Sequence, residues 1–162
     1  MKAIINATLI MRDHFIPDGI VLVENGKIVD FGEMRKLLVP EDAEIIDAEG
    51  LYVGPGFIDI HTHSDGYVFI QDEPEKACMH HLKHGTTTIL ACLYFNMNGQ
   101  QLVEQAACVK EAMKKPEGAS IVGFYMEAPY MNPKFGADRE NNPWKGPICK
   151  EEYQPVIDQV GT

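Results

Sequence analysis

Hydrophobic and polar positions follow a short period in the first third of the chain. Up to residue 52 the apolar runs are brief and separated by polar turns, which predicts β-strands rather than helices. The predicted strands cover residues 2–10, 19–23, 27–32 and 44–47. Asn25 and Gly26 stand between two of these runs and form the dipeptide that most favours a two-residue hairpin. We therefore expect residues 1–52 to form a small β-sandwich-like domain.

From residue 53 the pattern changes to apolar strands that alternate with segments of helical period. The predicted strands are 57–61, 86–91 and 120–126. The predicted helices are 74–84, 99–114 and one that begins near Lys150. Such alternation is typical of parallel βαβ units, so residues 53–162 are expected to form a second, α/β domain with three such units, the third cut short.

The most informative segment chemically is residues 53–63, which reads VGPGFIDIHTH. Side chains at i and i+2 of a strand point to the same face, so His61 and His63 lie side by side at the end of the first α/β strand. Two neighbouring imidazoles can bind one divalent cation, although two ordinary histidines near a turn would also fit a bare His-x-His. With this flanking sequence we favour a metal site.

Composition excludes several classes of partner. The chain carries 24 acidic against 14 basic residues and a net charge of −10, which argues against binding nucleic acid or anionic membranes. No apolar run approaches the roughly 20 residues of a membrane span, and the start of the chain lacks a signal-peptide pattern. Four widely spaced cysteines predict buried or idle thiols in a reducing cytoplasm rather than a disulfide framework. They are Cys78, Cys92, Cys108 and Cys149.

Residues 48–63 resemble the start of an amidohydrolase-superfamily barrel, and residues 18–32 resemble the N-terminal β-domain of that family. The resemblance implies that the chain is the N-terminal part of a (β/α)8 metal-dependent hydrolase barrel. It also implies that His61 and His63 bind one or two divalent ions, Zn²⁺ or Fe²⁺. A complete barrel takes about 250 residues, so we expect the barrel to be incomplete in this chain.

Glu127 follows the third predicted strand, where barrel enzymes place their chemistry. Alone, a carboxylate there is more often a solvated strand end. Residues 123–133, however, resemble the Gly-x-x-x-Glu-Gly-Pro-aromatic segment of N-acetylglucosamine-6-phosphate deacetylases, in which the glutamate binds the metal. The resemblance therefore implies a third ligand, Glu127, and a substrate that is an N-acetyl amino sugar phosphate.

Two departures from that pattern bear on the substrate. Ala128 replaces the usual glycine after the glutamate, and Asp138 follows Gly136 and Ala137 where the family often has a histidine that contacts the substrate. Ala137 and Asp138 are thus the predicted substrate-binding residues. An aspartate near a phosphate would repel it, so the particular amide substrate stays open.

The expected reaction is hydrolysis of an N-acetyl amide by a metal-activated water, with a carboxylate general base. The resemblance places that base, an aspartate, beyond Thr162, so no catalytic residue is assigned and the chain alone is expected to be inactive. The full-length enzyme is expected to be a homodimer. Two alternatives stay open: an amidohydrolase acting on a cyclic amide or a non-phosphorylated acetamido compound, and a non-catalytic binding or assembly module.

Overall fold

The computed structural model describes residues 1–63, 67–127, 129–132, 134–135 and 139–161 of the chain. The chain divides into two compact units, unit 1 (Met1–Pro55) and unit 2 (Gly56–Thr162). The predicted substrate-binding residues, Ala137 and Asp138, lie outside the described residues.

Unit 1 is a five-stranded sheet. Its strands are β1 (Lys2–Ile10), β2 (Phe15–Glu24), β3 (Lys27–Glu33), β4 (Glu44–Asp47) and β5 (Tyr52–Val53), with a short 3₁₀ turn, η1 (Met34–Lys36). The order is β3-β2-β1-β4, with β5 also paired to β1. Strands β1, β2 and β3 pair antiparallel, whereas β4 and β5 run parallel to β1. Alternate residues of β2 enter two separate apolar clusters, which explains why its run is apolar on both faces.

The predicted hairpin between β2 and β3 is confirmed. Asn25 and Gly26 both adopt positive φ, 50° and 74°, as a type I′ turn requires. Strand β2 begins four residues earlier than predicted, because Phe15 and Ile16 pair with the end of β1. An irregularity in that pairing accommodates Pro17, which the sequence alone marks as a strand breaker.

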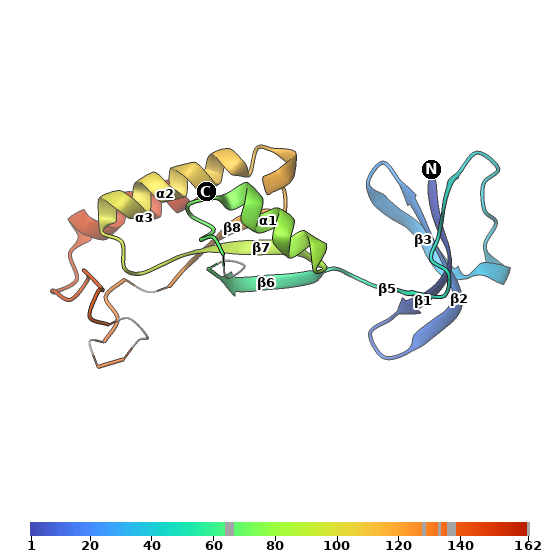
Figure 1. Cartoon of the computed structure of the whole chain (residues 1–162), viewed down its shortest axis with the longest axis horizontal. Helices are drawn as coiled ribbons and strands as arrows, with labels where there is room; N and C mark the ends of the chain where they lie inside the picture. Colours follow the sequence, from blue (N-terminus) through green and yellow to red (C-terminus); the bar gives the residue numbers. More distant parts are fainter. Residues whose placement is uncertain (64–66, 128, 133, 136–138, 162) are drawn as a thin grey trace. The chain divides into compact units, whose positions relative to one another are not determined.

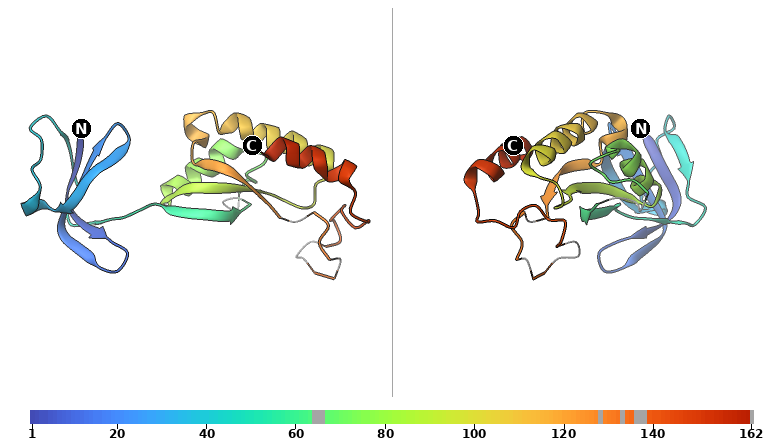
Figure 2. Two further views of the ribbon diagram at one scale, coloured as in Figure 1. Left: turned by 180° about the vertical axis from the view of Figure 1, so that it is seen from behind. Right: turned by 60° about the vertical axis from the view of Figure 1, so that its left-hand side comes forward.

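Unit 2 consists of a three-stranded parallel sheet with helices packed on one face (Figures 1 and 2). The strands are β6 (Phe57–Thr62), β7 (Thr86–Leu93) and β8 (Ile121–Met126), in the order β6-β7-β8. The helices are α1 (Pro74–Lys83), α2 (Gly99–Ala112) and α3 (Lys150–Val160), with a 3₁₀ turn η2 (Pro116–Gly118) before β8. All six elements agree in type with the sequence-based expectation.

The core of unit 2 lies between the sheet and the helices. Ile89, Ala91 and Leu93 of β7 point into it and meet Leu102 and Ala106 of α2. Helix α2 starts with a capping box: the Asn98 side chain accepts the Gln101 backbone N–H, and the Gln101 side chain accepts that of Asn98. Because side chains alternate along a strand, the even-numbered residues of β7 point to the face of the sheet that turns away from the helices.

Candidate metal centre

The face of the unit 2 sheet that turns away from the helices carries the predicted ligands at its carboxyl edge. His61 lies in β6, His63 follows it, and Glu127 comes directly after β8. Thr62, between the two histidines, points the other way and is buried, with its hydroxyl 3.4 Å from the His81 ring of α1. The alternation of the strand therefore places both imidazoles on the open face.

The structure brings together four side chains that carry potential ligand atoms: His61, His63, Cys92 and Glu127. One donor atom from each lies within 4.8 Å of all the others. Two imidazoles, a carboxylate and a thiol form a donor set that suits Zn²⁺ and related divalent ions. The three predicted ligands thus converge, although they come from strands that are more than 60 residues apart in sequence.

Two buried atoms of this group have no hydrogen-bond partner among the described residues, His63 Nδ1 and Glu127 Oε2. Glu127 Oε2 lies 3.0 Å from His63 Nε2, but that contact lacks hydrogen-bond geometry. Orphaned buried polar atoms cost free energy unless a ligand or an ion satisfies them. The unpartnered Glu127 carboxylate oxygen, close to His63 Nε2, therefore fits a bound cation.

Aromatic side chains hold the two imidazoles. The Tyr125 ring of β8 stacks on His61 with centroids 4.7 Å apart, and Tyr94 packs edge-on against His63 at 4.8 Å. The Asp59 carboxylate accepts the backbone N–H of His61 at 3.0 Å. The two ring contacts restrict the imidazoles to few orientations, which favours a preformed site.

Cys92 is the residue that the sequence analysis missed. The sequence predicts a buried or idle thiol; Cys92 is indeed buried, but its position on β7 also puts it in the group. Burial, reinforced by the Glu127 charge, raises the pKa of the Cys92 thiol to about 12. The only indication in the sequence was its place near the end of a predicted strand, and no local sequence pattern distinguishes Cys92 from an ordinary core cysteine.

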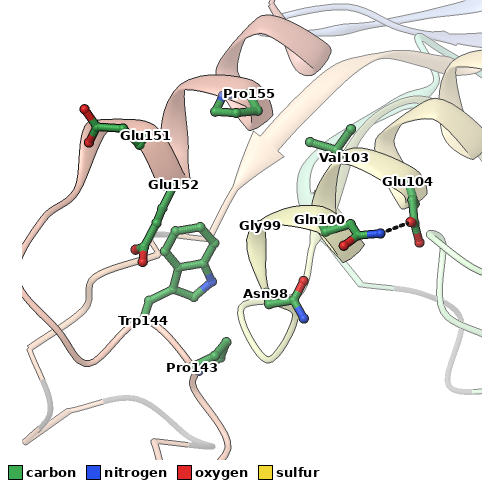
Figure 3. A pocket seen from close by; sticks show the side chains of 10 residues that line it. All are labelled: Asn98, Gly99, Gln100, Val103, Glu104, Pro143, Trp144, Glu151, Glu152 and Pro155. Atoms are coloured by element: carbon green, nitrogen blue, oxygen red, sulfur yellow. Dashed lines mark hydrogen bonds between the residues drawn. The ribbon is translucent and has the colours of Figure 1, made fainter.

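A cleft of about 640 Å³ lies elsewhere in unit 2, between the start of α2 and α3 (Figure 3). Its walls include Trp144, Glu152 and Pro155, and the Gln100 amide donates to Glu104 beside it. None of the four clustered ligands lines this cleft. This cleft and the ligand cluster are therefore different places in unit 2.

A model described as the amidohydrolase family matches residues 52–158. A dihydroorotase from Aquifex aeolicus (strain VF5) is 65% identical over 73 residues, which cover 43% of this chain and 16% of that protein. A D-hydantoinase from Geobacillus stearothermophilus is 38% identical over 92 residues, covering 55% of this chain and 19% of that protein. The matched part of the chain thus spans less than a fifth of the length of either relative.

Among solved structures, an N-acetylglucosamine-6-phosphate deacetylase from Pasteurella multocida matches with a TM-score of 0.77 at 21% identity. The match covers 98% of this chain and 42% of that one. At this identity the likeness shows the fold, and it confirms the predicted fold class: the opening of an amidohydrolase barrel with its small β-domain. Among the described residues, no helix has the length and apolar character needed to cross a bilayer.

Proposed function

The chain belongs to the amidohydrolase family, and from this premise we propose that it supplies metal ligands to a metal-dependent amide hydrolase. The observation that carries the proposal is the convergence of the His61, His63 and Glu127 donor atoms, with a buried Glu127 oxygen that has no hydrogen-bond partner among the described residues. The metal is proposed to be Zn²⁺ or Fe²⁺, as one or two ions, since nitrogen and carboxylate donors favour these over Ca²⁺ or Mg²⁺.

The protein residues have separate tasks in this proposal. A bound divalent ion supplies Lewis-acid activation of water and of the amide carbonyl. His61 in β6 and His63 just after it would hold the ion from one strand, and Glu127 would hold it from the end of β8. Tyr125 and Tyr94 keep the two imidazoles oriented through the ring contacts described above. Proton transfer is assigned to a general base on a later strand, in line with the deacetylase resemblance.

The proposed substrate is an N-acetyl amino sugar phosphate, hydrolysed to acetate and the free amine. The support is Glu127, because a metal-binding glutamate after the third strand belongs to the deacetylase resemblance, whereas dihydroorotase-like enzymes bridge two metals through a carboxylated lysine. Ala137 and Asp138 remain the proposed substrate contacts. For the intact protein we propose a cytoplasmic homodimer that acts on a small molecule.

A second candidate function is hydrolysis of a cyclic amide. The observation in its favour is the 65% identity to a dihydroorotase, which exceeds the identity to any deacetylase structure named above. Both candidates use the same histidine pair and the same cleavage of a carbon–nitrogen bond, so they differ in the substrate and in the third ligand.

Two activity assays on the intact gene product that contains this chain distinguish the two candidate functions. Acetate release from N-acetylglucosamine-6-phosphate and ring opening of dihydroorotate are measured in parallel after loading with Zn²⁺. We expect acetate release in the wild type and its loss in His61→Ala. His14→Ala, a matched change at an exposed histidine of unit 1, should retain it. Ring opening alone would move the assignment to the cyclic amide, and a wild-type protein without bound metal would overturn both.

A further inference from the structure

Cys92 has no role in the function proposed above, yet it belongs to the cluster. We propose that Cys92 is itself a metal ligand, which joins His61, His63 and Glu127 around a thiophilic divalent ion such as Zn²⁺ and leaves a further coordination position for the water that is activated. This inference rests on the metal site of the proposed function and adds to it the identity of the ion.

Strand register puts Cys92 on the ligand face. In the parallel pairing, Cys92 is the partner of Tyr125, whose ring stacks on His61. The preceding residue, Ala91, pairs with Thr62 and points with it toward the helices. Since side chains alternate along β7, Cys92 points to the opposite face, where the histidines and Glu127 lie.

The distances are close to those of a coordination sphere. Bonds of about 2.3 Å to sulfur and about 2.0–2.1 Å to nitrogen or oxygen place neighbouring donors of a tetrahedron roughly 3.3–3.6 Å apart. The four donors lie within 4.8 Å of one another, so the most distant pair must approach by up to about 1.2–1.5 Å to surround an ion. Cys92 is fully buried, and its sulfur is therefore fixed by packing near the other donors.

Cys78 shows what an uninvolved buried cysteine looks like in this chain. It is 1% exposed, like Cys92 at 0%, and packs from α1 into the apolar core. Burial alone is common for cysteine and does not indicate a ligand. Among the described cysteines, only Cys92 combines burial with two imidazoles and a carboxylate whose donor atoms lie within 4.8 Å.

A thiolate in the set has a consequence for metal choice. On binding, the Cys92 sulfur exchanges its proton for the ion, and the proton passes to the solvent. Thiolate ligands favour Zn²⁺, Co²⁺ and Cd²⁺ over the oxygen-preferring Mg²⁺ and Mn²⁺. The site is therefore expected to discriminate among divalent ions more strongly than two histidines and a glutamate would.

Cobalt spectroscopy on the full chain tests this assignment without an activity assay. The metal-free protein is titrated with Co²⁺ while the near-ultraviolet thiolate-to-cobalt charge-transfer band and the visible ligand-field bands are recorded. We expect the charge-transfer band in the wild type and in Cys78→Ser, and its loss in Cys92→Ser with at least about tenfold weaker Co²⁺ binding. Cobalt bound with ligand-field bands but no charge-transfer band overturns the role of Cys92 and leaves the metal site intact.

If Cys92→Ser does not fold, X-ray absorption spectroscopy of a zinc-loaded variant provides a second test. In a triple variant with Cys78, Cys108 and Cys149 changed to serine, Cys92 is the sole thiol. X-ray absorption should then still show zinc–sulfur scattering at about 2.3 Å. Zinc bound with nitrogen and oxygen scattering only would overturn the inference, and a wild type that binds neither Co²⁺ nor Zn²⁺ would overturn the proposed metal site as well.

Discussion

Replacing Trp144 with phenylalanine is expected to destabilise unit 2 by about 2–4 kcal/mol. The indole is 5% exposed, donates from Nε1 to the Met97 carbonyl at 2.7 Å and meets the Tyr130 ring edge-on at 5.0 Å. Phenylalanine removes the donor and leaves the Met97 carbonyl, in a buried residue, without its partner, which costs about 1–3 kcal/mol. The smaller ring adds about 1 kcal/mol of lost apolar burial.

Urea unfolding followed by far-ultraviolet circular dichroism measures this loss. The helical signal reports unit 2, because every α-helix of the described chain lies there. Tyr130→Phe is the matched control: its hydroxyl donates to Glu152 and accepts from the Cys149 N–H at a partly exposed position, so its removal should cost less than about 1 kcal/mol. A Trp144→Phe protein within about 0.5 kcal/mol of the wild type would show that the Met97 hydrogen bond does not anchor this segment.

Three further changes test other parts of the fold. Asn98→Ala removes the capping box of α2 and should cost about 1 kcal/mol in urea unfolding; an unchanged midpoint would count against the cap. Gly56→Ala should cost about 1–3 kcal/mol, because the new Cβ would meet the Thr87 side chain at 2.1–2.7 Å, whereas Gly146→Ala, with open space, should be neutral; equal thermal midpoints for the two would contradict the clash. Glu75→Gln should cost less than about 1 kcal/mol near neutral pH, because the Lys115 ammonium that bonds Glu75 holds the pKa of this carboxyl below its ordinary value. Because the Glu75 pKa is lower in the folded state, the ion pair stabilises the fold at pH values above the ordinary carboxyl pKa, and this stabilisation is lost as the pH falls through the folded-state pKa. The unfolding free energies of the wild type and Glu75→Gln should therefore converge in acid. A difference between them that does not change with pH would rule out the ion pair.

The geometry of the cluster relates the stability of the fold to its chemistry. Its ligands sit on or directly after the parallel strands β6, β7 and β8, whose spacing is set by backbone hydrogen bonds rather than by loops. On the helix side the same strands bury Ile89, Ala91 and Leu93, so a change in that packing would also shift the ligands. Rigid strands thus position the donors, which is the arrangement that precise metal binding requires.

Much of this protein follows from the sequence alone. The types of all predicted elements agree with the structure, because periods of two and of 3.6 residues are local properties of the chain. The turn at Asn25 and Gly26 is set by the backbone preferences of those two residues. His61 and His63 share a face because a strand alternates, and the position of Glu127 follows from the end of its strand.

Only the tertiary structure decided which residues from different strands meet. Cys92 joins the histidines because β7 pairs between β6 and β8 in one particular register, and Tyr125 reaches His61 for the same reason. That register is fixed by the crossover helices and the core beneath the sheet, contacts between residues far apart in the chain. The periodicity of the sequence predicts which face of its own strand each side chain occupies. Which side chains become its neighbours on the adjacent strands depends on packing that no local pattern encodes.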